Sequence, residues 1–420
     1  EYKIKYSNSI LLAIKEKDVS NIDLEEDISE ITLLSKTLGI SVQDIHRHNL
    51  KKIYPATYIS KQKADQLINI AKELKCENII LNIELSPSQM KNLQSMAGYD
   101  IRILDRNAII IDIFSVHAQS GEAKKQVNLA KLEYMLPRLT KQWTHLERQM
   151  GGTGTRGGPG EKQIEIDRRL IRKDIVKLKK DLEQIQKNRI TQSNSRVDSF
   201  KTSLVGYTNA GKSTLMNSLT NSDVYVKNEL FATLDSTTRS LKIKNKKNIL
   251  LSDTVGFIQK LPHELVASFR STLSDIKNSN LILKVIDASY FNINMHITTI
   301  ENTLEEIECL DIPSLYIFNK IDLINNDRLL TLMKRYKKSI FVSGLKNIGL
   351  DHITNYIAEE VAQDYISEKI KLTYSDLGLI DDIYKTFNIT SRKDLQDGVL
   401  LVAEGKKESF NKIRSKLKKT

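Results

Sequence analysis

The sequence predicts an α/β protein whose largest part is a doubly wound, mostly parallel sheet. Two observations carry this prediction. Between residues 199 and 365, short apolar runs typical of buried parallel strands alternate with helical stretches. Between residues 119 and 198, apolar residues recur every three or four positions over two long stretches, which is typical of packed helices.

The composition is that of an ordinary folded protein. Of the 420 residues, 40% are apolar and 28% are charged, so the chain is neither disordered nor fibrous and is long enough for roughly two to four domains. A net charge of +12 indicates an acidic partner, either nucleic acid or an anionic membrane face, although an AT-rich genome would also enrich Ile, Asn and Lys. Cys76 and Cys309 lie outside any CxxC spacing, and no apolar run approaches the roughly 18 residues of a membrane span. We expect a cytoplasmic protein with buried, reduced cysteines; peripheral attachment to a membrane is the variant left open.

Residues 1–118 are expected to form a small α/β domain. Its β-branched runs at 10–14, 78–83 and 109–114 alternate with helical stretches such as 65–74 and 86–97. His46, His48 and His117 have no metal-ligand spacing and are expected to be solvated or structural. We predict no catalytic group in this domain.

Residues 119–198 are predicted to form a long antiparallel helical hairpin, because a short break separates two apolar stripes of similar length. The first stripe is Leu132, Leu136, Leu139, Trp143, Leu146 and Met150, and the second is Ile164, Ile171, Ile175, Leu178, Leu182 and Ile185. Pro137 is expected to kink the first arm. The two stripes would pack against each other.

The break at 151–160 holds more glycines than a turn between helices needs. Its glycines are Gly151, Gly152, Gly154, Gly157, Gly158 and Gly160, and its one cation is Arg156. Bare backbone amides and a guanidinium suit close approach to a phosphate-lined surface, whereas a flexible connector is the simpler alternative. We favour the contact loop, because residues 161–190 carry ten Lys or Arg against six acids.

Residues 206–213 read Gly-x-x-x-x-Gly-Lys-Ser after an apolar strand and before a helical stretch, which is the context of a phosphate-binding loop. Its glycines let backbone N–H groups point at a β-phosphate, Lys212 would bridge β and γ oxygens, and Ser213 would ligate Mg²⁺. The residues expected to contact the phosphates are Gly206, Tyr207, Thr208, Asn209, Ala210, Gly211, Lys212, Ser213 and Thr214.

Two downstream segments fit switches that sense the nucleotide state. Asp253 follows a predicted strand at 248–252, where it could hold a magnesium-bound water, and the Gly256 amide could sense a γ-phosphate. Thr233 is our choice for the second hydroxyl on Mg²⁺, with Thr237 and Thr238 as alternatives. Switch I comprises Phe231, Ala232, Thr233, Leu234 and Asp235, and switch II comprises Asp253, Thr254, Val255, Gly256 and Phe257.

A third motif predicts selection of guanine. Asn319-Lys320-x-Asp322 follows an apolar run at 314–318, so the Asp322 carboxylate could accept hydrogen bonds from guanine N1 and N2, which adenine cannot supply. Asn319 and Lys320 would brace the ring and the phosphate loop. The amides of Ser343, Gly344 and Leu345, after the 340–342 run, could reach guanine O6. Four motifs in this order at strand ends predict a Mg²⁺-dependent GTPase with a P-loop G domain at 199–365.

Two residues qualify the predicted mechanism. Phe257 stands where many signalling GTPases place a water-orienting glutamine, so we expect slow intrinsic turnover that awaits a partner. Asn209 resembles the asparagine with which some GTPases help to bind K⁺, although a loop-stabilising role is an equal alternative. Residues 366–420 follow as a small α/β domain, with strands at 369–374 and 398–403 and helices at 376–387 and 408–417.

Over nearly its whole length the chain resembles the HflX family of ribosome-associated GTPases. The family-specific part is the segment from Trp143 to Gln149, the glycine loop, Glu161, and Asp167-Arg168-Arg169; Asp105-Arg106 and the motifs at 206–214, 231–235 and 253–258 agree with it. The resemblance favours Thr233 as the magnesium ligand. The sequence departs from the family pattern at Lys162, which replaces an uncharged residue, and at Ser236 and Gly344, which stand where proline and alanine are usual. Its glycine loop is one residue longer.

This resemblance implies a protein that binds the large ribosomal subunit and its rRNA in the GTP form. We expect a monomer, because nothing in the sequence demands more than one copy. It would push the glycine loop toward the peptidyl-transferase region and split stalled or stressed ribosomes, with hydrolysis permitting release. A related GTPase of large-subunit assembly or tRNA modification, and a GTP-locked RNA-binding anti-association factor, are the alternatives. A role in membrane signalling is disfavoured, since no lipidation motif ends the sequence.

Overall fold

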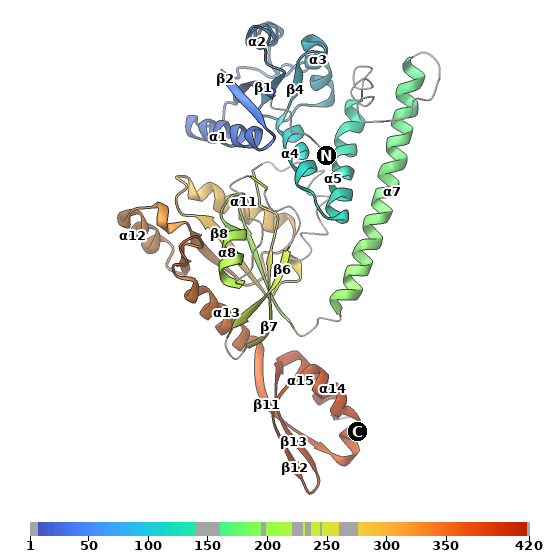
Figure 1. The fold of residues 1–420 in the computed structure, drawn as a ribbon, viewed down its shortest axis with the longest axis vertical. Helices are drawn as coiled ribbons and strands as arrows, with labels where there is room; N and C mark the ends of the chain where they lie inside the picture. The colour runs from blue at the N-terminus through green and yellow to red at the C-terminus, as the bar shows by residue number, and fades with distance from the viewer. Residues whose placement is uncertain are drawn as a thin grey trace. The chain divides into compact units, whose positions relative to one another are not determined.

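The computed structural model describes residues 7–139, 160–194, 199–220, 230–231, 237–243, 246–259 and 276–417. The chain forms two compact units (Figure 1). Unit 1 comprises residues 1–189, 226–236 and 255–274, and unit 2 comprises residues 190–225, 237–254 and 275–420. Within the described ranges, no helix combines the length and the apolar character that crossing a bilayer requires.

Unit 1 is built on a parallel four-stranded sheet in the order β2-β1-β3-β4. The strands are β1 (Ser7–Lys15), β2 (Ile40–Asn49), β3 (Asn78–Leu81) and β4 (Arg102–Leu104), and the helices between them are α1 (Asn21–Thr37), α2 (Lys61–Glu73) and α3 (Pro87–Ala97). Each helix begins at a serine, Ser20, Ser60 or Ser86, whose side chain accepts a hydrogen bond from a first-turn backbone N–H. The predicted helices at 65–74 and 86–97 are confirmed.

The run at 109–114, predicted to be strand-like, lies instead in helix α4 (Arg106–His117). Eight of the twelve side chains of α4 are buried, Arg106 and Asn107 among them, so its sequence shows little contrast between an apolar and a polar face. The N-cap residue of α4 does carry a signal for a helix, because the fully buried Asp105 accepts a hydrogen bond from the Ala108 N–H at 2.8 Å. Length and the aspartate cap therefore decide for a helix.

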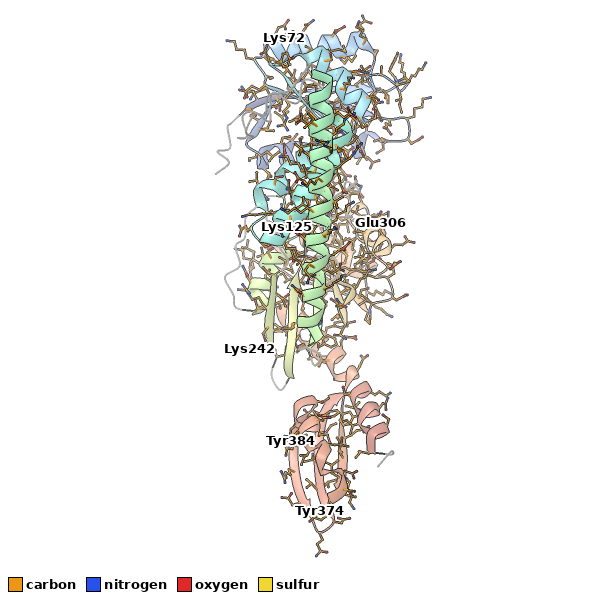
Figure 2. All side chains as sticks on the ribbon, turned by 90° about the vertical axis from the view of Figure 1, so that its right-hand side faces the viewer. Lys72, Lys125, Lys242, Glu306, Tyr374 and Tyr384 are labelled. Carbon is orange, nitrogen blue, oxygen red and sulfur yellow. The ribbon has the colours of Figure 1, made fainter. Side chains whose placement is uncertain are left out.

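Helices α5 (Gly121–Met135) and α7 (Gly160–Asn194) form an antiparallel pair, with a 3-10 turn, η1 (Leu136–Arg138), after α5 at Pro137. Lys125, labelled in Figure 2, pairs with Asp181 at 2.7 Å, and Glu133 pairs with Lys179 at 2.8 Å, so the partner's number falls as the α5 number rises. The shared core consists of Leu129, Leu132, Leu136, Leu139, Ile171, Ile175, Leu178 and Leu182. Both predicted stripes thus meet, while Trp143, Leu146 and Met150 lie outside the described residues.

Unit 2 contains a six-stranded sheet in the order β10-β9-β8-β5-β7-β6. The strands are β5 (Phe200–Gly206), β6 (Thr237–Ile243), β7 (Lys246–Asp253), β8 (Leu281–Asp287), β9 (Ser314–Asn319) and β10 (Ser339–Phe341). Its helices are α8 (Lys212–Thr220), α11 (Ile293–Glu306), α12 (Asn326–Arg335) and α13 (Leu350–Asp364), with the 3-10 turn η3 (Ile321–Leu323). All neighbours are parallel except β6 against β7 at the edge. The predicted doubly wound sheet is confirmed, and the antiparallel edge strand β6 was not predicted.

The last part of unit 2 is an antiparallel sheet in the order β11-β13-β12. It comprises β11 (Tyr365–Thr373), η4 (Tyr374–Leu379), α14 (Ile380–Thr386), β12 (Asn388–Leu395), β13 (Gly398–Lys406) and α15 (Lys407–Leu417). Helices and sheet share an apolar core in which the rings of Phe387 and Phe410 lie 4.4 Å apart, while Tyr374 and Tyr384 are exposed (Figure 2). Strand β12 escaped prediction because most of its side chains are polar and exposed, as is common at a sheet edge.

Candidate functional site

The predicted phosphate loop connects β5 to α8 and turns at two positions of positive φ. Asn209 has φ +60° and Gly211 has φ +87°. Gly206 is required for another reason, since a Cβ there would lie 2.2 Å from the backbone oxygen of Val285 on β8. The loop therefore ends one strand, lies against the next, and delivers its N–H groups to the start of α8.

The side chain of Lys212 folds back under this loop. Its Nζ donates to the carbonyl oxygens of Gly206 at 3.2 Å and Tyr207 at 3.0 Å, and the residue is 6% exposed. Burial lowers the pKa of Lys212 to about 8; Asp253 acts against this shift and Lys320 adds to it. The loop thus holds an ammonium group that loses its proton more readily than an exposed lysine.

Ser213 and Asp253 bring two oxygen atoms together at the C-terminal ends of β5 and β7. The Ser213 hydroxyl donates to Asp253 Oδ2 at 2.5 Å, and Asp253 is fully buried. Thr254, the residue after Asp253, is held in place because its hydroxyl donates to the Leu204 carbonyl at 2.8 Å. Hard oxygen donors in this arrangement fit Mg²⁺, which prefers one or two protein oxygens and the phosphates of a substrate.

Among the other candidate magnesium ligands, Thr237 and Thr238 belong to the described residues. Thr233 lies outside the described residues, as do Ala232, Leu234 and Asp235. Thr237 and Thr238 lie on β6, opposite Asp253 and Ser252, and the Thr238 and Ser252 hydroxyls are 2.8 Å apart. The choice of Thr233 stays a prediction.

The predicted guanine motif is joined to the phosphate loop through Asn319. Its Nδ2 donates to the Ala210 carbonyl at 3.0 Å and its Oδ1 accepts from the Gly344 N–H at 2.9 Å. Lys320 has φ +62° and its Nζ lies 2.8 Å from Asp287. Asp322 and Leu345 are both exposed. Asn319 accepts from the Gly344 amide and Ser343 forms a two-bond bridge with Ile348, so of the three amides the prediction for guanine O6 is left to Leu345.

Phe231 of the predicted switch I, and Gln259 just after the predicted switch II, contact helix α4 within unit 1. Phe231, at φ +57° and 2% exposed, packs its ring 4.6 Å from that of Phe114, and its carbonyl accepts from His117 Nδ1 at 2.8 Å. The carbonyl of Gln259, two residues after Phe257, accepts from Arg106 Nη2 at 3.0 Å, and the same Nη2 pairs with Glu30 on α1. His117 is thus structural, as predicted, but its partner lies in a switch.

Phe257 is 3% exposed, and its side chain has no group that could orient a water. Val255 and Gly256 precede it in irregular backbone. Of the predicted contact loop, Gly160 is the first residue of α7, and residues 151–159 with Arg156 lie outside the described ranges.

Comparison with known proteins agrees with this geometry. Three family models match in order: "GTP-binding GTPase N-terminal" over residues 25–115, "GTP-binding GTPase Middle Region" over 117–196 and "50S ribosome-binding GTPase" over 201–320. A curated relative from Magnetococcus marinus, "GTPase HflX", is 36% identical and covers 94% of this chain and 92% of its own. The chain belongs to the HflX family. A second HflX GTPase, from Flavobacterium psychrophilum, is 41% identical over 83% of this chain and 84% of its own.

The HflX family assignment makes the chain a GTPase, as predicted. Among solved structures, a GTP-binding protein from Sulfolobus solfataricus in complex with GDP is 26% identical, with a TM-score of 0.43, over 85% of this chain and 99% of its own.

Asp287 contacts the predicted guanine motif, and the sequence reasoning did not name it. It ends β8, its carboxylate binds Lys320, and its Oδ1 accepts from the N–H of Ser289 at 2.9 Å. The signal was available, because an aspartate that ends an apolar run at the carboxyl edge of a parallel sheet lies where such sheets bind ligands.

Proposed function

We propose that this HflX GTPase binds the large ribosomal subunit in its Mg²⁺·GTP form, separates it from the small subunit, and leaves after hydrolysis. The observation that carries the proposal is the one-sided charge of α7. With about 3.6 residues per turn, the face opposite the buried Ile171 and Ile175 bears only cations among its charged side chains. They are Arg169, Lys173, Lys177, Lys180 and Lys187. Such a face, roughly 27 Å long, suits a phosphate backbone.

Other observations support the same partner. The acids Asp181 and Glu133 at the α5 side are already bound to lysines, so they do not neutralise the opposite face. The family model that matches residues 201–320 is described as a 50S ribosome-binding GTPase. The net charge of +12 is also what an rRNA-binding protein needs.

Within the nucleotide site we assign roles from the contacts above. Residues 206–214 would hold the phosphates, Lys212 would leave its two carbonyls for the β and γ oxygens, and Asp322 would accept from guanine while the Leu345 amide donates to O6. Ser213 directly, and Asp253 through water, would hold Mg²⁺ together with Thr233. When bound, Mg²⁺ supplies positive charge next to the phosphate oxygens.

The switch contacts give the proposal a mechanical route. Phe231 and Gln259 contact α4, and α4 precedes the hairpin helix α5 by only three residues. A rearrangement of either switch would therefore disturb Phe114, His117 or Arg106 on that helix. Since Phe257 cannot orient a water, turnover would stay slow until a partner completes the site.

Sedimentation with purified ribosomal subunits tests this function. A non-hydrolysable GTP analogue, but not GDP, is expected to carry the protein onto the large subunit and to dissociate whole ribosomes. Deletion of residues 151–160 is expected to abolish dissociation while preserving GTP binding. Binding that ignores the nucleotide, favours the small subunit, or splits ribosomes without the loop contradicts the proposal and leaves the GTPase alone.

Charge reversal tests the α7 face. Lys173→Glu, Lys177→Glu and Lys180→Glu together are expected to weaken large-subunit binding at least about tenfold and to flatten its salt dependence. The matched control reverses three exposed lysines on α2 and α3 of the same unit, namely Lys61, Lys72 and Lys91. Equal losses in both triple variants would mean that total charge, and not this face, matters.

Nucleotide affinity is expected to fall as the pH rises above about 8. Phosphates favour the charged form of Lys212, whose pKa is lowered to about 8, so binding above that pH must take up a proton and weakens by up to about tenfold per pH unit. The effect on stability has the opposite sign. Between about pH 8 and the ordinary lysine pKa, the unfolded chain binds more protons than the folded chain, so the free energy of unfolding of the nucleotide-free protein rises with pH. Calorimetry with GDP from about pH 6.5 to 8.8, in buffers of different ionisation enthalpy, measures both affinity and proton uptake. A flat affinity without proton uptake would contradict it.

A further inference from the structure

Three aromatic rings from different segments stack behind the phosphate loop in unit 2. Tyr207, the second residue of the loop, has its ring centroid 4.1 Å from that of His296 on α11, with 14° between the planes. On its other side His296 lies 4.0 Å from Tyr290, at 19°. Tyr290 belongs to the connection between β8 and α11. The imidazole is therefore sandwiched between the phosphate loop and that connection.

The stack, and not hydrogen bonding, holds His296. The residue is 3% exposed, and neither ring nitrogen has a hydrogen-bond partner within the described structure. Burial lowers the pKa of His296 to about 4; Asp287 opposes this shift and Lys320 adds a little to it. The ring is thus neutral at physiological pH, and its contribution is the face that it presents to each tyrosine.

Each end of the stack is fixed to a different half of the nucleotide site. At one end, the Tyr207 carbonyl accepts from Lys212 Nζ at 3.0 Å and from the Ala210 N–H at 3.2 Å, so it forms the inner turn of the phosphate loop. At the other end, the Tyr290 carbonyl accepts from Arg328 of α12, which also donates through Nε to the Ala288 carbonyl at 3.1 Å.

The connection that carries Tyr290 is also bonded to the guanine motif. The Ala288 N–H donates to the Asn319 carbonyl at 2.9 Å, and Asp287 holds Lys320 at 2.8 Å. These contacts make the connection part of the guanine half of the site. His296 is the side chain that lies between it and the ring of Tyr207.

We propose that His296 is a positioning residue for the nucleotide: through the Tyr207 ring it sets where the phosphate loop lies relative to the guanine motif. The inference rests on the proposed assignment of residues 206–214 to the phosphates. It adds a buried residue that belongs to none of the GTPase motifs. GDP and GTP share the β-phosphate that the loop holds, so a displaced loop weakens the binding of both nucleotides.

His296→Leu tests the proposal, because leucine keeps an apolar side chain in the core but offers no ring to stack. We expect both GDP and a non-hydrolysable GTP analogue to bind about tenfold more weakly, with a raised KM for GTP. His296→Phe restores the stack without the nitrogens and is expected to recover affinity to within about threefold of wild type.

The matched control is Ile300→Ala, at a fully buried position one turn further along the same helix that is not in the stack. It is expected to lower Tm at least as much as His296→Leu and to leave nucleotide affinity unchanged. If His296→Leu binds like wild type, if its loss is matched by Ile300→Ala, or if His296→Phe is as weak as His296→Leu, the inference is wrong. Each of these results leaves the GTP site intact, whereas failure of the wild-type protein to bind GDP would remove the site assignment itself.

Discussion

Asp322→Asn is expected to change the base specificity of the enzyme from guanine to xanthine nucleotides. The Asp322 carboxylate offers two acceptors to guanine N1–H and to the 2-amino group, whereas an asparagine opposes that amino group with an NH₂ of its own. Xanthine carries a carbonyl at position 2, which accepts from this NH₂ while N1–H donates to the amide oxygen. We expect GTP affinity to fall about 10³-fold and the affinity for xanthosine triphosphate to rise by a comparable factor.

The structure favours a clean test at this position. Asp322 is exposed in η3 and makes no hydrogen bond to any other residue that the structure describes, so the substitution breaks no internal contact. Direct titration of the variant and of the wild type with GTP and with xanthosine triphosphate measures the preference, and an unchanged Tm shows that folding is intact. Asp327→Asn, at an exposed acid of the following helix, is the matched control and should change nothing. A variant that loses GTP without gaining xanthosine triphosphate would move base recognition to another residue.

The sequence sufficed wherever local chemistry dictates structure. Glycines at 206 and 211, a lysine between loop and helix, and a strand-end aspartate at 253 are each required by backbone geometry or by phosphate binding, and the structure brings Lys212, Ser213, Asp253 and Asn319 to one edge of the sheet. The antiparallel hairpin followed in the same way, because its two apolar stripes have the helical period that places Ile171 and Ile175 in one seam.

Sequence reasoning failed where a tertiary contact decides. Helix α4 reads as a strand because most of its side chains are buried and few polar positions remain to reveal its period. The contact of Phe231 with Phe114 joins residues more than a hundred positions apart, and no local pattern marks either ring as a partner. His296 is a third example, because a lone histidine on an amphipathic helix gives no sign in the sequence that its ring stacks on Tyr207 and Tyr290.

Gly206→Ala is expected to destabilise the six-stranded sheet strongly. The new Cβ would lie 2.2 Å from the oxygen and 3.1 Å from the carbonyl carbon of Val285, both backbone atoms of the neighbouring strand β8. A flexible side chain could turn away, but β8 is paired with both β5 and β9 and cannot move without breaking one ladder. Overpacking of this kind costs about 3 kcal/mol or more, which corresponds to a fall of roughly 6 °C or more in Tm.

The effect should extend to nucleotide binding, because the Gly206 carbonyl also accepts from Lys212 and the residue begins the phosphate loop. Thermal unfolding with and without saturating GDP separates the two: the variant should unfold earlier and gain little from GDP, since ligand stabilisation requires an intact site. Gly378→Ala, in the same unit and with open space around the added carbon, should leave both values unchanged. A Gly206→Ala protein that melts like wild type would show that β5 and β8 can separate at this point, and the tight approach of the two strands would then not be what requires glycine there.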